Sequence, residues 1–297
     1  MDLIEQIKTI TNEKNIYINE SMSKHTSFKT GGPADIFVVP ESKDEIIKLL
    51  KLDTPKTIIG NGSNLLVKDG GIRGLVIKID ISNYEVYEDV IVADAGCMIA
   101  KLSRIAMENS LSGLEFACGI PGTLGGAIYM NAGAYGSEMK DIVVETEVVD
   151  YNGNIFTVKE HDFSYRSSKF QNMECVILSS KLQLHHGDKE EIQQKINEYM
   201  SARKAKQPID KPSAGSTFKR PKDNFAAKLI QDAGLKGYSI GGAEVSNLHS
   251  GFVINKGNAT TKEIIELIKY IREKVNAEFG VLLEPEVRII GEEIKDE

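Results

Sequence analysis

The segment Cys118–Gly136, CGIPGTLGGAIYMNAGAYG, combines many glycines with a complete lack of charge. Six of its nineteen residues are glycine, and none is acidic, basic or histidine. Glycine lets the backbone approach a ligand closely and adopt positive φ. Binding would then come from main-chain N–H groups, Thr123, Asn131 and tyrosine hydroxyls, which suits a flat, partly apolar ligand carrying a diphosphate. These residues predict a nucleotide-like cofactor, and a tightly packed loop is the alternative.

A second glycine loop, Gly60–Asn64, follows the apolar run TII. Glycines in a tight turn expose consecutive N–H groups that can cradle an anion, although an ordinary turn between two strands explains the loop as well. Gly60, Gly62 and the later Asp80 match part of a dinucleotide fingerprint. Position 65 is leucine and no helix pattern follows, so a Rossmann site is not predicted. The pattern GxxxxGK[ST] of nucleotide-hydrolysing P-loops is absent from the sequence.

The composition is that of an ordered globular protein. The chain has 297 residues, 41% of them hydrophobic, and a net charge of −7, which argues against general affinity for nucleic acid or anionic membrane. No apolar run approaches the roughly 20 residues needed to cross a bilayer. The N-terminus lacks the zones of a signal peptide. Three scattered cysteines without a CxxC pair argue against a disulfide framework and a zinc site, and they favour a protein of the reducing cytoplasm. No metal site and no membrane partner are predicted.

The elements that would position these loops are mostly short strands in the first part of the chain. Runs rich in Val and Ile predict strands at 34–40, 56–60, 74–79 and 89–96, and a hairpin at 146–158 with Asn152-Gly153 as two positive-φ turn residues. A capping box at Ser42–Glu45 begins one helix, and another is expected to end near Gly113.

The character of the chain changes after about residue 187. An amphipathic helix is predicted up to Pro208, with Ile192, Ile196, Tyr199 and Met200 on one face. A short helix follows at 225–234, and a long one is capped by Thr260 with Glu263 and ends at Gly280. The pattern predicts one domain at 1–188 and a second at 189–297.

Six sequence blocks occur in the order found in one family. Together with the 119–136 segment, the chain closely resembles the UDP-N-acetylenolpyruvoylglucosamine reductases, flavoenzymes of bacterial peptidoglycan synthesis. The blocks are HTSFKTGGPAD (25–35), IIGNGSNLLVKDGGIRG (58–74), FSYRSSKF (163–170), KQP…SAGSTFKRP (206–221), AAKLIQDAGLKGYSIGGAEVS (226–246) and LLEPEVRIIG (282–291).

The resemblance implies an α+β fold. It comprises an FAD-binding domain of the vanillyl-alcohol-oxidase (PCMH) type in two subdomains, about 1–55 and 56–188, and a C-terminal α+β substrate-binding domain whose last strand returns to the active site. It also implies non-covalent FAD. The implied cofactor-binding residues are Gly60, Asn61, Gly62, Ser63, Asn64, Leu65, Gly119, Ile120, Pro121, Gly122, Thr123, Gly125, Gly126, Asn131, Ala132 and Gly133.

The reaction implied by the resemblance is reduction of an enolpyruvyl ether of a UDP-sugar. NADPH reduces the flavin, whose N5 delivers hydride to the methylene carbon, giving UDP-N-acetylmuramate. Arg166 would stabilise the substrate carboxylate and the developing enolate. Ser216 would donate the proton, and Glu286 would lie beside the enolate as a hydrogen-bond partner. Without the resemblance, a surface arginine, a turn serine and a solvated edge-strand glutamate describe the three residues better.

Substrate contacts are expected from Tyr165, Lys206, Lys219 and Arg220. Forty positions separate Arg166 from Lys206, too few for the inserted tyrosine loop of some family members, so the chain resembles the shorter subtype. A cytoplasmic monomer is expected. Two alternatives stay open: a non-catalytic binding protein for UDP-sugars, which would bind without turnover, and a different flavin oxidase of the same fold.

Overall fold

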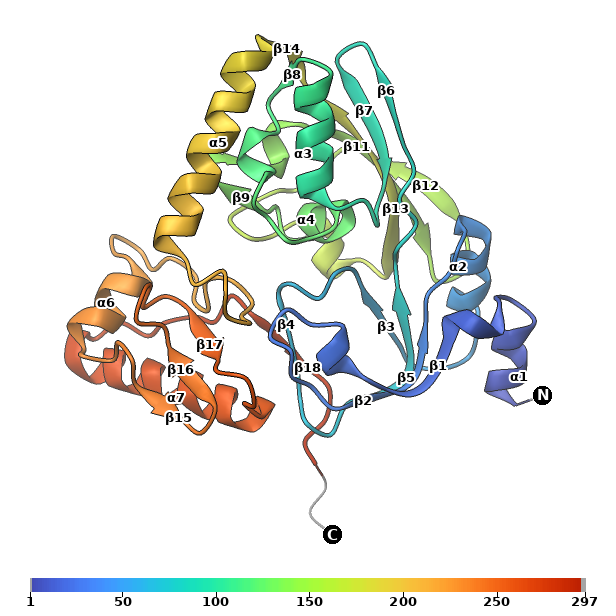
Figure 1. Ribbon diagram of the computed structural model, residues 1–297. Helices are drawn as coiled ribbons and strands as arrows, with labels where there is room; N and C mark the ends of the chain where they lie inside the picture. Colours follow the sequence, from blue (N-terminus) through green and yellow to red (C-terminus); the bar gives the residue numbers. More distant parts are fainter. Residues whose placement is uncertain (1, 295–297) are drawn as a thin grey trace. The chain divides into compact units, whose positions relative to one another are not determined.

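The computed structural model describes residues 2–294 and divides into two compact units. The first unit comprises the residues up to Tyr17, then Ile36–Asn61 and Leu75–Ala202. The second comprises Ile18–Asp35, Gly62–Gly74 and the residues from Arg203 onward. Figure 1 shows the elements of both units.

The centre of the first unit is a five-stranded antiparallel sheet of order β12-β11-β13-β7-β6. Its strands are β6 (Tyr84–Tyr87), β7 (Val90–Asp94), β11 (Val143–Asp150), β12 (Ile155–Val158) and β13 (Cys175–Gln183). The middle strand β13 is buried at five consecutive positions, Val176–Ser180, as expected of a strand covered on both faces. Helix α4 (Leu124–Tyr129) packs against β7 and β13 (Figure 1).

Short elements connect this sheet to the glycine-rich segment. Helix α3 (Ile99–Glu108) leads into β8 (Leu111–Ser112), which pairs with β14 (His185–His186). After α4, strands β9 (Gly133–Ala134) and β10 (Ser137–Glu138) form a hairpin. Helix α5 (Lys189–Lys206) then carries the chain from the first unit into the second, whose boundary lies between Ala202 and Arg203.

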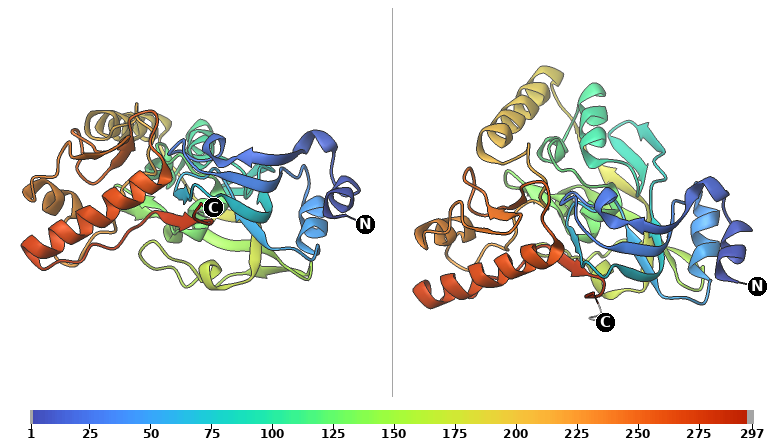
Figure 2. Two further views of the ribbon diagram at one scale, coloured as in Figure 1. Left: turned by 90° about the horizontal axis from the view of Figure 1, so that it is seen from below. Right: turned by 60° about the horizontal axis from the view of Figure 1, so that its bottom comes forward.

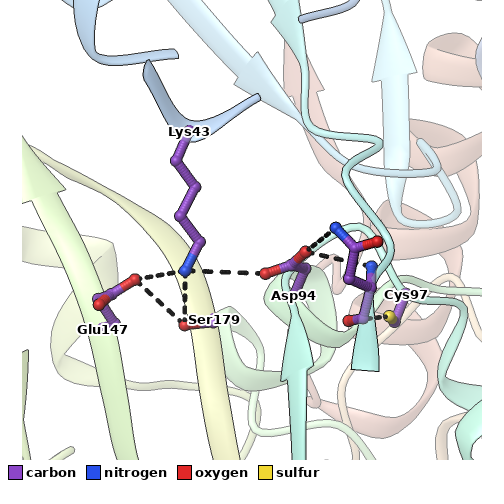
Figure 3. A network of polar contacts seen from close by, with 6 residues as sticks. Lys43, Asp94, Cys97, Glu147 and Ser179 are labelled. Atoms are coloured by element: carbon purple, nitrogen blue, oxygen red, sulfur yellow. Dashed lines mark hydrogen bonds and ion pairs between the residues drawn. The ribbon is translucent and has the colours of Figure 1, made fainter. Parts of the chain in front are cut away.

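A four-stranded sheet of order β1-β2-β5-β3 contains β1 (Ile16–Ser21), β2 (Pro33–Val38), β3 (Lys56–Ile59) and β5 (Ile72–Lys78). Helices α1 (Leu3–Lys8) and α2 (Lys43–Leu50) belong to the same part of the chain. Figure 3 shows how α2 is tied to the large sheet. Lys43 Nζ lies 2.6 Å from Glu147 Oε1 on β11, 3.3 Å from Ser179 Oγ on β13 and 3.7 Å from Asp94 Oδ1 on β7.

The second unit is built around helix α7 (Thr261–Phe279). The helix runs along a three-stranded sheet of β15 (Ser239–Ile240), β16 (Ala243–Val245) and β17 (Val253–Asn255) (Figure 2). Helix α6 (Ala226–Asp232) also contacts α7, and β18 (Arg288–Ile290) pairs in parallel with β4 (Leu65–Val67). The predicted capping box of Thr260 with Glu263 and the C-terminal stop at Gly280, whose φ is 69°, are both confirmed.

The compact units differ from the predicted division at residue 188. Residues 18–35 and 62–74 group with the C-terminal part because β4 pairs with β18 and because Asp69 caps α7. The Asp69 carboxylate accepts hydrogen bonds from Thr261 N (2.9 Å) and Lys262 N (2.8 Å). Such long-range contacts leave no local signal in the sequence.

Three local expectations are corrected. In the hairpin of β11 and β12 only Gly153 has positive φ, since the Asp150 carboxylate instead accepts hydrogen bonds from Asn152 N and Asn154 N and closes the turn. Helix α3 ends at Glu108, well before Gly113, because Ser110 adopts a φ of 57°. On the expected apolar face of α5, Ile192 is buried and Ile196 and Tyr199 are half-buried, but Met200 is exposed.

Among residues 2–294, no helix has both the length and the apolar character needed to span a bilayer. Within the same residues there is no group of three or more His, Cys, Asp or Glu side chains arranged to hold a metal ion.

Candidate active site

Within the first unit, the start of the Gly60 loop touches the glycine-rich segment directly. A Cβ atom at Gly60 would lie 2.4 Å from Thr123 Oγ1, so a side chain there would collide with the second loop. The amide of Asn61 donates a 2.6 Å hydrogen bond to the carbonyl oxygen of Pro121. Residues 60–61 and 121–123, predicted separately as cofactor-binding, therefore lie in contact with each other.

The N–H groups at the start of α4 are satisfied inside the protein. Leu124 N donates to Cys97 O (2.7 Å), Gly125 N donates to Ala95 O (2.8 Å), and Gly126 N donates to Thr123 Oγ1 (3.4 Å). An anionic ligand would therefore rely on other groups of the segment. The glycines serve close packing here, because a Cβ at Gly125 would lie 2.9 Å from the Ala95 Cβ.

Asn131 is fully buried, and its side chain fastens neighbouring segments to one another. Its amide nitrogen donates to Glu138 Oε2 and to Ser164 O, both at 3.0 Å, and its amide oxygen accepts from Lys140 N at 3.0 Å. The Asn131 side chain and the backbone N–H groups of Asn131 and Ala132, which donate to Ile128 O and Ala127 O, are therefore all bonded within the protein.

Arg166 lies in a tight turn attached to this segment. Ser164 and Ser167 exchange backbone hydrogen bonds of 3.0 and 3.1 Å, and Arg166 has a φ of 55°, as at the third position of a type II turn. The guanidinium donates to Gly133 O (3.2 Å) and lies 5.1 Å from the ring centre of Tyr165. A non-glycine residue held at positive φ costs about 1–3 kcal/mol and is commonly found at functional sites.

Thr217–Lys219, which directly follow Ser216, and Glu284–Glu286 come from distant parts of the sequence and pair in one ladder of the second unit. Glu286 N donates to Thr217 O (2.8 Å), Lys219 N donates to Glu284 O (2.9 Å), and Phe218 and Pro285 form an antiparallel bridge between them. Thr217 is buried and anchors this ladder to β17, since its hydroxyl oxygen accepts from Val253 N (2.9 Å). Ser216 follows Gly215, whose φ is 76°, and is exposed.

The rest of the Gly60 loop is bound to the same ladder. Asn64 donates from its side-chain amide to Glu286 O (3.2 Å), and its carbonyl oxygen accepts from Arg288 N (3.0 Å). Ser63 O accepts a hydrogen bond from Ser27 Oγ at 3.3 Å, and Leu65 pairs with Arg288. A Cβ at Gly62, where φ is 61°, would lie 2.0 Å from His25 O. Predicted cofactor and catalytic residues are therefore neighbours within the second unit.

The predicted substrate-binding cations differ in their surroundings. Lys219 forms an ion pair with Glu284. Arg220 stacks on Phe225, with its guanidinium carbon 4.2 Å from the ring centre. Lys206 is the last residue of α5 and is exposed, and Tyr165 in the first unit is also exposed.

Two positioning residues escaped the sequence analysis. Thr217 adjoins Ser216 and was not predicted to have a role, although its hydroxyl group accepts a hydrogen bond from β17. Gln171 holds the Arg166 turn by donating hydrogen bonds to Arg166 O (3.1 Å) and Tyr129 O (3.0 Å). No local pattern distinguishes either residue from ordinary polar positions.

The chain is similar to known proteins over nearly its whole length. Residues 34–159 match the family model "FAD binding domain", and residues 207–290 match "UDP-N-acetylenolpyruvoylglucosamine reductase, C-terminal domain". The curated reductase of that name from Caldanaerobacter subterraneus is 52% identical over 98% of both chains, and one from Clostridium botulinum is 48% identical with the same coverage.

Solved structures agree with this assignment. The Thermus caldophilus UDP-N-acetylenolpyruvylglucosamine reductase has a TM-score of 0.81 and 33% identity, covering 92% of this chain and 97% of that one. Phl p 4.0202, a glucose dehydrogenase, has a TM-score of 0.52 at 12% identity, covers 64% of this chain and 45% of that one, and shares the fold alone. The predicted fold class is confirmed, and the chain belongs to the UDP-N-acetylenolpyruvoylglucosamine reductase family.

Proposed function

We propose that this protein is a flavin-dependent reductase that converts UDP-N-acetylglucosamine enolpyruvate to UDP-N-acetylmuramate in bacterial peptidoglycan synthesis, with NADPH as reductant. The observation that carries the proposal is the near full-length identity of 52% to a reductase of that name. The proposed acting species is a cytoplasmic monomer.

The first unit suits FAD because its two glycine loops offer a surface without charged side chains. The contact of Gly60 with Thr123 and the bond from Asn61 to Pro121 hold the two loops together and leave no space for a Cβ at Gly60. In this proposal residues 60–65, 119–123, 125–126 and 131–133 hold the cofactor. Bound FAD, once reduced by NADPH, supplies the hydride that adds to the methylene carbon of the enolpyruvyl group.

The protein's own task is to stabilise the negative charge that then develops beside the substrate carboxylate, and to deliver a proton. Arg166 is suited to the first task because its planar guanidinium can bind a carboxylate through two hydrogen bonds and keeps its proton. Ser216 donates the proton to the carbon next to the carboxylate. Glu286 provides a hydrogen bond to the enolate that forms there. Their shared ladder supports the pairing of the last two roles. Tyr165, Lys206, Lys219 and Arg220 contact the UDP-sugar.

The proposal is tested by incubating the purified flavoprotein with NADPH and UDP-N-acetylglucosamine enolpyruvate and analysing the product by mass spectrometry. The expected product carries two more hydrogens than the substrate. Arg166→Met should lower the turnover by about 10²-fold or more. Lys169→Met, in the same loop, is the matched control and should retain near wild-type turnover. A flavin-loaded wild-type protein that forms no such product would overturn the proposal.

A further inference from the structure

Helix α5 contacts residues just before the glycine-rich segment 119–136 and a residue at the far end of that segment, although most of the helix is exposed. At the first end, Lys195 Nζ lies 3.7 Å from Glu115 Oε1, and Cys118 Sγ donates to Ile196 O at 4.0 Å. At the other end, the Tyr199 ring stacks on Tyr135 with 4.0 Å between ring centres. These helix positions are one turn apart and share a face.

The contact at the first end involves a buried carboxylate. The side chain of Glu115 is 5% exposed and accepts hydrogen bonds from Ser112 Oγ (2.6 Å) and Gly113 N (2.7 Å). Burial opposes ionisation, but these hydrogen bonds, one from its own backbone and the charge of Lys195 outweigh it and lower the pKa of Glu115. Glu115 therefore stays ionised and fixes the turn that enters the glycine segment.

The contact at the second end holds a strained turn. Tyr135 and Gly136, the two residues between the paired Ala134 and Ser137, have φ values of 54° and 90°, the signature of a type I′ turn. Asparagine, aspartate or glycine normally occupies the first of these positions, since a bulky residue at positive φ is strained. The Tyr135 hydroxyl donates to Tyr199 O (2.8 Å), and the ring stack adds to this bond. Tyrosine at position 135 is therefore less favourable for the turn itself than asparagine or glycine, but its side chain attaches the turn to α5.

We propose that α5 is a brace for the cofactor-binding segment, with Lys195 and Tyr199 as positioning residues that act through Glu115 and Tyr135. The inference rests on the proposed function, because it takes segment 119–136 as the FAD site. The brace pre-organises the two ends of the segment, and loss of pre-organisation weakens binding mainly by speeding dissociation. None of these four side chains is assigned a role in the chemistry.

The test measures FAD release from the holoprotein after dilution, followed by the rise of free-flavin fluorescence. Tyr199→Leu removes the stack and should speed release about five- to tenfold. Lys195→Met removes a partly exposed ion pair and should speed release about two- to threefold. Met200→Leu and Lys189→Met are matched controls on the same helix and should release FAD at the wild-type rate.

Tyr135→Gly separates bracing from simple turn formation. Glycine fits a type I′ turn better than tyrosine, so the flavin-free protein should unfold at the wild-type temperature or above. FAD release should nevertheless be faster by about five- to tenfold, and Tyr135→Phe, which keeps the stack, should restore part of the difference. Wild-type release rates in Tyr199→Leu, Lys195→Met and Tyr135→Gly would overturn the brace while leaving the proposed function intact. A wild-type protein that binds no FAD would remove the proposed function itself.

Discussion

At the residue scale, the proposed chemistry depends on a serine that is a poor acid by itself. Ser216 can donate a proton only where cations and hydrogen bonds stabilise the alkoxide that remains. Ser216 is the residue before Thr217, and the ladder pairs Thr217 and Phe218 with the segment that carries Glu286. The backbone of Thr217 bonds to Gly251 O and Glu286 N, and Ser216 itself is exposed.

Ser216→Ala should separate the two half-reactions. NADPH should reduce the bound flavin at the wild-type rate, because no proton from Ser216 is needed in that step. Reoxidation by the enolpyruvyl substrate should slow by about 10²–10⁴-fold, the usual range for loss of a general acid. Anaerobic stopped-flow absorbance measures both rates, and equal losses in the two steps would contradict the role of Ser216.

A buried histidine makes the stability of the first unit sensitive to acid. His161 is buried, contacts Thr146 Oγ1 at 2.9 Å through Nε2 and stacks on Phe163. Burial, with a smaller contribution from Lys169, lowers its pKa below the ordinary 6.5 despite an opposing backbone hydrogen bond. The unfolded chain therefore binds a proton first as the pH falls below about 6.5, which favours unfolding.

His161→Gln should remove part of this acid sensitivity. In the wild type the free energy of unfolding should fall by up to about 1.4 kcal/mol per pH unit from this group below pH 6.5. The variant should show a shallower fall, measured by urea unfolding between pH 7.5 and 5. His185→Gln, at an exposed strand position, is the control. An identical pH dependence in His161→Gln and wild type would contradict this account.

At the element scale, α4 connects the glycine loops to the large sheet. Its first N–H groups are bonded to Cys97 and Ala95, which lie just after β7, so the segment is seated on the sheet rather than suspended as a free loop. Gly126 differs from its neighbours. A Cβ there would meet Thr123 Oγ1 at an ordinary 3.5 Å, so the protein itself has space for a methyl group.

Gly126→Ala tests whether that space belongs to FAD. Alanine favours helix by about 0.5–1 kcal/mol over glycine, so the flavin-free protein should be as stable as wild type or slightly more. FAD affinity should fall about tenfold or more if the cofactor lies against this position. Gly60→Ala should lower both stability and affinity, because its Cβ would lie 2.4 Å from Thr123 Oγ1. Calorimetric FAD titration measures the affinity, and wild-type affinity in Gly126→Ala would place the cofactor elsewhere.

The sequence predicted elements well where the signals were local. The capping residues Thr260 and Glu263 and the stop at Gly280 are found as expected, because each acts within one helical turn. The apolar periodicity of α5 also predicted its inward face, since Ile192 is buried and Ile196 and Tyr199 are half-buried, and only Met200 of the four is exposed. The left-handed conformations of Tyr135 and Arg166 were not foreseen, because neither residue type favours positive φ. Contacts between distant residues, such as Asn64 with Glu286, carry no local signal.

At the scale of the whole molecule, the chain divides its predicted site residues between two units. Residues 60–61, 119–133 and 165–166 belong to the first, and residues 62–65, 206–220 and 286 belong to the second. The ranges matched by the two family models lie mostly in different units, with FAD binding assigned at 34–159 and the reductase C-terminal domain at 207–290. Segments 18–35 and 62–74 join the second unit through β4 and Asp69, so the order of the chain alone does not define the units.

The most direct test of the central claim is the visible absorption spectrum of the purified protein during anaerobic titration. The account predicts a yellow protein with flavin bands that bleach on adding NADPH and return on adding UDP-N-acetylglucosamine enolpyruvate. A colourless protein that takes up no added FAD, or a reduced flavin that this substrate does not reoxidise, would contradict it.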